Sequence, residues 1–283
     1  MVLALLLRLS LAQEVQCEDE PCAPIDRGAE VQLAWQQSLG KPLAERLRMI
    51  SEPMLGAEYV VDGIGEGEGR DSDPMVRFDS FDCLSFVEEL LAWTYATSLE
   101  EVSTTRQQIR YNGSIHFDNR RHFMVPQWIP DNISAGRLVD VTHHYGETQV
   151  AHKTITTRNW MRWRGRWKYE FSPDQYPTGS FTLGLLSLDA AVAATKEFPD
   201  GTLLVVVRES RESNPVWVTH LGMVLRHSQW DVRIRHATKM GGGVLRDDRL
   251  PWYFEHLRTF RRWPVLGILV LQPVELAAQT GVP

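Results

Sequence analysis

Apolar residues recur at helical spacing between residues 78 and 91, at steps of three and four: Leu84, Val87, Leu90 and Leu91. This spacing places them on one stripe of a helix and predicts that the stripe is buried. Polar residues that can cap the first turn come just before the stripe: Asp79, Ser80 and Asp82. The pattern therefore predicts a buried helix that begins at about Cys83.

Further helices are predicted before and after this one: Glu30–Trp35, Leu43–Ile50, Leu99–Arg110 and Leu185–Phe198. Beyond residue 200 the pattern changes to apolar and β-branched runs that are typical of strands: Leu203–Val207, Val216–Leu225, Trp230–His236 and Leu266–Leu271. Helices followed by such strands predict an α+β fold, with N-terminal helices packed on a mostly antiparallel β-sheet. We expect a single catalytic domain over residues 29–283.

Three other segments have a distinct character. Tyr59–Val61 is a short extended piece, and the glycine-rich stretch Asp62–Asp73 that follows is a predicted surface loop. Residues 158–169 alternate arginine with tryptophan, which predicts a hairpin that turns at Gly165. Its aromatic residues would cover the core or line a cleft for sugars, although such a segment could also stack nucleic-acid bases.

Composition narrows the possible functions. The chain has 283 residues, of which 43% are apolar, and its ten tryptophans are ample for a substantial core. Its net charge of −6 argues against a nucleic-acid binder, because phosphate binding normally requires a basic surface.

The N-terminal residues predict export. Val2–Ala12 is an apolar run that ends in small residues, so we expect residues 1–12 to be a signal peptide, although Arg8 lies within it and a first helix is the alternative. Cys17 and Cys22 follow in an acidic segment, residues 13–28, where a disulfide loop would suit an oxidising compartment. We expect a periplasmic or secreted protein of the cell envelope, without stable membrane insertion once the signal is removed.

Cys83 is then a free thiol in the first turn of the predicted helix. Free amide groups and the helix dipole favour negative charge there, so we expect this thiol to ionise more readily than a free one and to act as a nucleophile. The alternative is a small apolar residue of the core, which is a common place for free cysteine.

Two histidines lie on predicted neighbouring strands. His220 interrupts an otherwise apolar strand, and His236 ends the next one after a connection short enough for a hairpin. His220 could act as the base for Cys83, and His236 could orient His220 through its other ring nitrogen. Taken singly, each histidine could equally be a hydrogen-bonded structural residue.

Other chemistries have less support. The remaining histidines lack the tight spacing of metal ligands, and no HExxH pattern occurs, so we expect neither a metal nor an organic cofactor: His116, His122, His143, His144, His152, His227 and His256. A GxSxG serine motif is also missing. A glycosidase with paired carboxylates is left open, because carboxylate separation is a three-dimensional quantity.

At these residues the sequence resembles the NlpC-type papain-like cysteine peptidases, which hydrolyse bacterial cell walls. The motifs that match are 55–59, 81–83 with 86–88, 219–222 and 236–238. It is most similar to the branch described as N-acetylmuramoyl-L-alanine amidase-like, through residues 109–111, Arg120, His122, Trp128 and 140–142. The resemblance runs from Leu55 to about Leu271. It departs at Gly201-Thr202, where relatives commonly have Gly-Asp, and in a longer spacing between His220 and His236.

The resemblance implies a papain-like fold in which Cys83 is the nucleophile, His220 the base and His236 the orienting residue. It also implies that Tyr59 faces the cleft, and we expect Asp82 and Thr219, the neighbours of Cys83 and His220, to contribute to substrate binding. The implied substrate is peptidoglycan or a muropeptide, cut between N-acetylmuramic acid and L-alanine.

Three alternatives remain open from the sequence. The wider superfamily more often cuts the stem peptide between γ-D-glutamate and a diamino acid. The same fold could instead serve as a non-catalytic wall-binding module, in which Cys83 would be inert. A thiol acyltransferase, which transfers the acyl group to an acceptor other than water, is the third.

Overall fold

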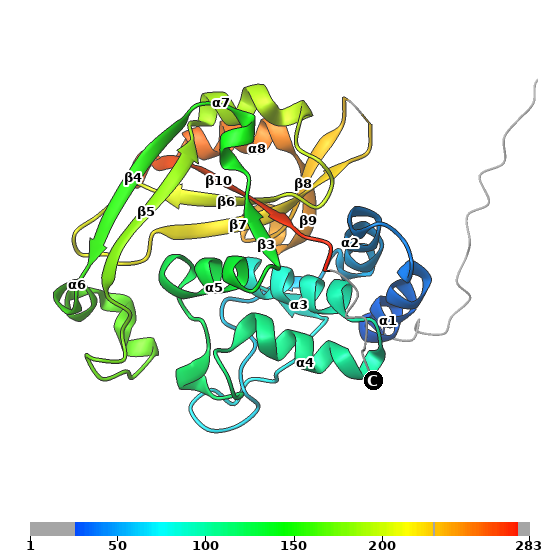
Figure 1. Ribbon diagram of the computed structural model, residues 1–283, viewed down its shortest axis with the longest axis horizontal. Coiled ribbons are helices and arrows are strands. Elements are labelled where there is room, and N and C mark those ends of the chain that lie inside the picture. The colour runs from blue at the N-terminus through cyan, green and yellow to red at the C-terminus, as the bar shows by residue number, and fades with distance from the viewer. Residues whose placement is uncertain (1–25, 229, 277–283) are drawn as a thin grey trace, which may run out of the picture.

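One large sheet crosses the molecule and separates two groups of helices (Figure 1). The computed structural model describes residues 26–228 and 230–276. In these residues the sheet has ten strands, in the order β2-β1-β9-β8-β7-β6-β10-β5-β4, with β3 paired to β10. All strand pairs are antiparallel except β1 with β2. The fold is therefore mixed α+β with a largely antiparallel sheet, as predicted.

The strands have these bounds: β1 Glu58–Tyr59, β2 Ser80–Phe81, β3 Leu138–Asp140, β4 Thr148–Ile155, β5 Gly179–Leu186, β6 Leu203–Arg208, β7 Val218–Arg226, β8 Val232–Thr238, β9 Val244–Arg249 and β10 Val265–Pro273. The α-helices are α1 Arg27–Ser38, α2 Leu43–Ser51, α3 Cys83–Tyr95, α4 Leu99–Arg110, α5 Ile129–Ser134, α6 Thr157–Arg162, α7 Leu188–Ala193 and α8 Leu250–Arg258. A π-helical turn at Met124–Trp128 leads into α5.

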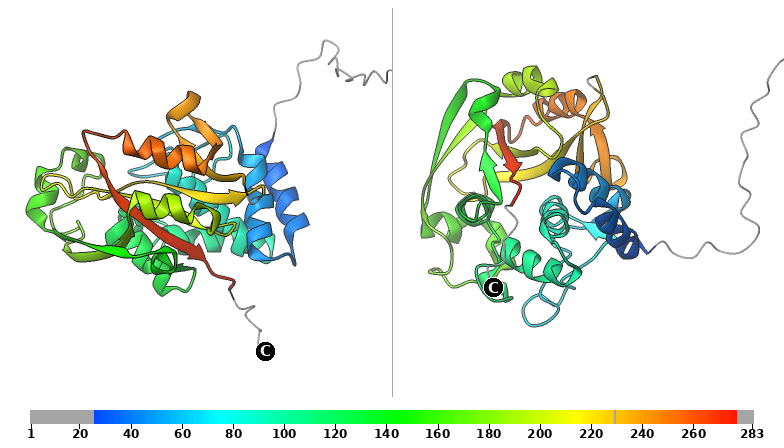
Figure 2. Two further views of the ribbon diagram at one scale, coloured as in Figure 1. Left: turned by 90° about the horizontal axis from the view of Figure 1, so that it is seen from above. Right: turned by 45° about the vertical axis from the view of Figure 1, so that its right-hand side comes forward.

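The two faces of the sheet carry separate cores. The first helices of the chain, with α3 at the centre, pack on one face, and α7 and α8 cover the other (Figures 1 and 2). Alternate residues of β6 show why: Val205 and Val207 join the core beneath α3, whereas Leu204 and Val206 join the core beneath α8. Such a strand is buried on both faces, which explains its uninterrupted apolar sequence.

The predicted strands after residue 200 are confirmed, but two predicted segments are wrong. Leu185–Phe198 is not one helix, because β5 extends to Leu186 and α7 begins only at Leu188. Residues 158–169 do not form a hairpin either. They form α6 and a 3₁₀ turn, Arg164–Lys168, which start from a capping box between Thr156 and Asn159.

The N-terminal predictions fall outside the described residues. These are the signal peptide and the disulfide between Cys17 and Cys22, both of which stay predictions.

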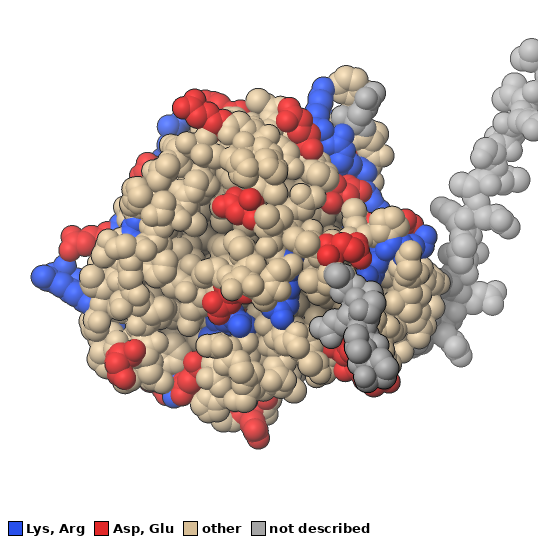
Figure 3. All heavy atoms as spheres, viewed as in Figure 1, with Lys and Arg blue, Asp and Glu red and all other residues tan. Residues whose placement is uncertain are grey.

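Within residues 26–228 and 230–276, no helix is long and apolar enough to cross a membrane. On the face shown in Figure 3, acidic and basic side chains occur in small mixed groups.

Helix α3 is buried along almost its whole length, although it contains two glutamates. Every residue from Ser85 to Tyr95 is buried. Glu88 accepts a hydrogen bond from Arg110 Nε at 2.9 Å, and Glu89 accepts two bonds of 2.6 Å from Arg106. Both arginines belong to α4, so these ion pairs fix the position of α3 against its neighbour.

We therefore expect Glu88→Gln to destabilise the fold by about 2 kcal/mol, because it removes the nearer of the two carboxylates that pair with the buried Arg110 guanidinium and leaves only Glu89, at 4.0 Å. Urea unfolding followed by circular dichroism measures this loss. Glu45→Gln is the matched control, since it removes a carboxylate from an exposed pair with Lys41 and should change stability little. Equal stability of the two variants would contradict a structural role for the buried pair.

Candidate active site

Cys83 is the first residue of α3, as predicted. The Asp82 side chain caps the helix by accepting from the backbone N–H groups of Leu84 at 3.0 Å and Ser85 at 2.8 Å. Ser85 Oγ accepts in return from the N–H of Asp82, which completes a capping box. These bonds hold the first turn of the helix rigidly and so fix the position of the thiol.

His220 and His236 meet on strands β7 and β8. His220 Nε2 lies 2.7 Å from His236 Nδ1, and the two rings are edge to face. Gly222 makes this approach possible, because a Cβ at that position would come within 2.9 Å of the His236 Cβ atom. The structure thus brings together the two histidines that the sequence singled out.

A third residue, Asp248 on β9, extends this chain of hydrogen bonds. Its Oδ2 atom lies 3.1 Å from His236 Nε2, and its Oδ1 atom lies 2.7 Å from an Nη atom of Arg246. His236 is fully buried and Asp248 is nearly so. The three side chains therefore form a line across three neighbouring strands, which is buried at His236 and Asp248 and partly exposed at His220.

The chemistry of Asp248 sets the direction of this chain. An ionised carboxylate only accepts hydrogen bonds, so His236 must carry its proton on Nε2. His236 Nδ1 is then an acceptor and takes a hydrogen bond from His220 Nε2–H. The remaining nitrogen of His220, Nδ1, is left without a proton and is the atom that can act as a base.

The thiol lies beside the strand that carries this base. Helix α3 packs against β7 and β8, and the N–H group of Leu221 contacts the Cys83 sulfur and acts to lower the pKa of its thiol. Leu221 immediately follows His220 in β7. The nucleophile candidate and the base candidate therefore come from elements in direct contact.

The predicted easy ionisation of Cys83 is wrong for this structure. Burial raises the pKa of the thiol to about 12, and the charge of Asp82 acts in the same direction. The N–H groups of Leu221, Cys83 and Leu84 lower the pKa, but their effect is smaller. Burial also lowers the pKa of His220, with smaller contributions from His236 and Arg208. Both side chains keep part of their surface exposed, and the two shifts favour the neutral forms.

The three predicted binding residues lie around this centre. Tyr59 on β1 is half-buried, and burial raises the pKa of its hydroxyl, as do the nearby Cys83 and Asp82. Asp82 uses its carboxylate in capping, and its Oδ2 atom also accepts from the N–H of Asp62 at 3.2 Å. Thr219 Oγ1 accepts from Arg208 Nε at 2.9 Å.

Sequence reasoning missed Asp248 and also Tyr253. Tyr253 on α8 packs its ring against both histidines, at centroid distances of 5.1 Å from His236 and 6.2 Å from His220. Asp248 lies in the polar stretch Leu245–Leu250, which has no apolar alternation and was not predicted as a strand. Had that stretch been recognised as the strand that pairs with the strand of His236, Asp248 would have been expected beside His236.

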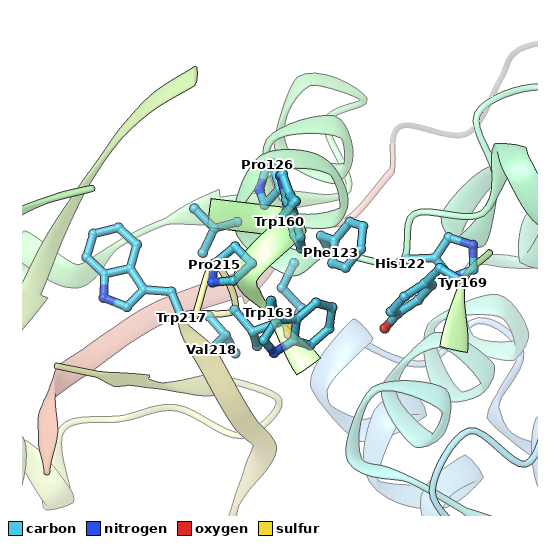
Figure 4. Close-up of a pocket in the computed structure, with 12 residues that line it drawn as sticks. His122, Phe123, Pro126, Trp160, Trp163, Tyr169, Pro215, Trp217 and Val218 are labelled. Atoms are coloured by element: carbon cyan, nitrogen blue, oxygen red, sulfur yellow. The ribbon is translucent and has the colours of Figure 1, made fainter. Parts of the chain in front are cut away.

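Two hollows meet on the α3 side of the site. The first, the aromatic pocket, has a volume of about 210 Å³ and is shown in Figure 4. Its walls come from three segments of the chain: His122–Pro126, Trp160 to Tyr169, and Pro215–Val218. The second, the charged pocket, includes Asp62, Asp82, Arg120 and Lys168 and shares His122 and Tyr169 with the first. The two hollows thus form one surface that leads to the start of α3.

No metal centre is evident in residues 26–228 and 230–276, because no three side chains among His, Cys, Asp and Glu are grouped so that they could hold an ion. His122 is buried among aromatic rings, and its Nε2 atom lies 2.7 Å from the carbonyl oxygen of Phe117. His143 and His144 pack on each other in the turn before β4.

We expect iodoacetamide to alkylate Cys83 at about pH 7 about 100-fold or more slowly than it alkylates the thiol of a small peptide. The reason is that a neutral thiol is a poor nucleophile. The rate should rise about tenfold with each pH unit. Peptide mapping by mass spectrometry would assign the alkylation to Cys83, with urea-unfolded protein as the control. Asp82→Asn keeps an N-cap group but removes the charge, so it should speed the reaction. A rate plateau below pH 7 would instead indicate a thiolate–imidazolium pair at rest.

Solved structures with the same fold are known. Protein LPG0564 from Legionella pneumophila str. Philadelphia 1 is 20% identical, with a TM-score of 0.76 over 89% of this chain and 96% of that one. A crystal structure of an N-acetylmuramoyl-L-alanine amidase from Bacteroides uniformis ATCC 8492 is 18% identical, with a TM-score of 0.61 over 88% of this chain and 99% of that one. No curated protein matches the sequence. The family model AmiA-like, described as N-acetylmuramoyl-L-alanine amidase-like, matches residues 49–259, and the chain therefore belongs to that family.

Proposed function

We propose that this protein hydrolyses the amide bond between N-acetylmuramic acid and L-alanine in peptidoglycan or muropeptides, with Cys83 as nucleophile. Membership of the amidase-like family supports a peptidoglycan amidase-like function. The observation that carries the thiol mechanism is the hydrogen-bonded line from Asp248 through His236 to His220, beside the Cys83 helix. A cysteine at a helix N-terminus and a histidine on a neighbouring strand also agree with the resemblance of the sequence to the NlpC-type papain-like peptidases.

The first half of the reaction forms a thioester. As Cys83 Sγ bonds to the amide carbonyl carbon, its proton passes to Nδ1 of His220, and the carbonyl oxygen becomes an oxyanion. The C–N bond then breaks, and the His220 imidazolium gives its proton to the leaving amine of L-alanine. His236 and Asp248 keep the His220 ring in the orientation that both transfers need.

The second half returns the enzyme to its resting state. A water molecule attacks the thioester while its proton passes to His220 Nδ1, and the new tetrahedral intermediate breaks its C–S bond. The proton then returns to the sulfur, and the lactyl group leaves as a carboxylic acid that ionises in water. His220 Nδ1 is therefore the donor or the acceptor in each of the four proton transfers.

Two groups are suited to stabilise the oxyanion. The backbone N–H of Cys83 is a free donor at the N-terminus of α3, where the helix dipole favours negative charge. Tyr59 is the second, because its raised pKa keeps the hydroxyl protonated as a donor.

The aromatic pocket favours the sugar-linked bond over a bond within the stem peptide. Two of its rings, Trp163 and Tyr169, are partly exposed and offer flat apolar faces of the kind that pack against sugar rings, whereas Trp160 is buried behind them (Figure 4). A muramoyl group held there would bring its lactyl amide toward the start of α3. The expected export of the protein to the cell envelope agrees with a peptidoglycan substrate.

Mass spectrometry of defined muropeptides incubated with the wild type and with Cys83→Ala tests this proposal. We expect the wild type to release an intact stem peptide from the sugar, and Cys83→Ala to release none, because it lacks the attacking sulfur. Cleavage between γ-D-glutamate and the diamino acid would make the protein an endopeptidase instead. If both folded proteins left every muropeptide intact, a wall-binding module would be the better description. Transfer to an added amine in place of water would indicate an acyltransferase.

Asp248→Asn tests the direction of the histidine chain. An asparagine amide can donate to His236 Nε2, which would reverse the hydrogen bonds and leave His220 Nδ1 protonated, so we expect kcat/KM to fall about 100-fold. Steady-state kinetics over a range of pH measures this effect, and thermal unfolding checks that the fold persists. Asp231→Asn removes an exposed aspartate paired with Arg233 and should leave kcat/KM unchanged. An active Asp248→Asn variant would show that Asp248 does not set the tautomer.

A further inference from the structure

A second polar hollow lies beside β7, in the space between Thr219 and the connection from α8 to β10. We call it the Arg208 pocket, and the residues that line it are Arg208, Thr219, Thr259, Phe260, Arg261, Arg262 and Trp263. None of these residues belongs to the aromatic or the charged pocket. The proposed mechanism gives this hollow no role.

Arg208 is more than nine-tenths buried, yet it lacks an acidic partner in the described part of the chain. Its Nε donates to Thr219 Oγ1 at 2.9 Å, and its Nη1 donates to the carbonyl oxygen of Trp263 at 2.9 Å. The guanidinium carbon lies 4.2 Å from the centre of the Phe260 ring. These contacts fix the plane of the guanidinium, and its second Nη atom donates to no residue between 26 and 276 among those described.

Three more arginines surround this hollow. Arg261 and Arg262 are exposed on its rim, and Arg211 lies with its guanidinium carbon 5.1 Å from the Trp263 ring. Arg211 also donates to the carbonyl oxygen of Arg262. Like Arg208, these three form no ion pair with a described residue, whereas the nearby Arg258 pairs with Asp189 and Glu255. The pocket therefore has an uncompensated positive charge in a chain whose net charge is −6.

The pocket adjoins the proposed base. Thr219, which anchors Arg208, directly precedes His220 in β7, and Arg208 is close enough for its charge to lower the pKa of His220. A substrate whose amide bond lies between Cys83 and His220 therefore has the Arg208 pocket as a neighbouring site along β7. The aromatic pocket lies on the α3 side of β7, and the Arg208 pocket lies toward α8.

We propose that the Arg208 pocket binds a carboxylate of the peptide part of the substrate and so selects for free acidic stem peptides. A fixed, desolvated guanidinium is well suited to a carboxylate, which it can meet with two parallel hydrogen bonds. The glutamate of the stem supplies such a group a short distance beyond the amide bond. This inference rests on the proposed function, because it assumes a peptide attached to the sugar.

A matched pair of substrates tests the proposal: N-acetylmuramoyl-L-alanyl-D-glutamate and its diamide, in which both carboxylates are carboxamides. We expect the wild type to prefer the acid by about tenfold or more in kcat/KM, with the difference in KM, because the contact is made before the reaction. Arg208→Gln should abolish the preference for the acid. Arg262→Gln should reduce this preference, and because Arg262 is exposed, the substitution leaves the buried residues unchanged. Arg258→Gln removes a positive charge outside the pocket and should keep the full preference.

Equal kcat/KM values for acid and diamide in the wild type would overturn the proposal while leaving the amidase function intact. An undiminished preference in both Arg208→Gln and Arg262→Gln would overturn it as well. If neither compound is hydrolysed, calorimetric binding of both to Cys83→Ala still decides the matter and separates it from the proposed function. The pocket is supported if Cys83→Ala binds the acid more tightly than the diamide and if the double variant Cys83→Ala/Arg262→Gln loses this difference. Equal binding of the two compounds to Cys83→Ala rejects it.

Discussion

The burial of α3 is the constraint on which the rest of the structure depends. Charged groups in a helix surrounded by protein need opposite charges nearby, and Glu88 and Glu89 find them in Arg110 and Arg106 of α4. These pairs tie the two consecutive helices α3 and α4 together. The start of α3 is then held against β7 and cannot slide, because a shift along the helix axis would break both ion pairs. The position of Cys83 is therefore set by charges that lie one and two turns away from it.

Burial also determines the electrostatics of the candidate site. A thiol and an imidazole that are partly removed from water lose some of the stabilisation that water gives to their charged forms, so burial favours the neutral forms of Cys83 and His220. The helix terminus favours the thiolate, but Asp82, which caps that terminus, opposes it with a full negative charge. Asp82, which makes the helix begin at Cys83, thus adds to the effect of burial in favouring the protonated thiol. In the proposed mechanism, proton transfer is then coupled to attack on the substrate.

Sequence patterns predicted the parts of this site that depend on local chemistry. The start of α3 followed from its caps and apolar stripe, and the meeting of His220 with His236 followed from two apolar strands joined by a short turn. Asp248 was missed because β9 is polar, so its pairing with β8 is determined by tertiary contacts and not by its own periodicity. The pKa of Cys83 was misjudged for a related reason. Burial depends on which distant segments cover a residue, and the local sequence does not contain that information.

The hydrogen-bonded line and most of the pocket walls are built from different elements of the fold. The hydrogen-bonded line lies on three adjacent strands, β7, β8 and β9, whose register fixes its geometry. Most of the walls of the aromatic pocket and of the Arg208 pocket come instead from connections, such as α6 and the segment after α8, although Val218 and Thr219 of β7 and Arg208 of β6 also contribute. Loops tolerate substitution better than paired strands do. Substrate preference in this fold can therefore change through the connecting segments while the alignment of Asp248, His236 and His220 stays the same.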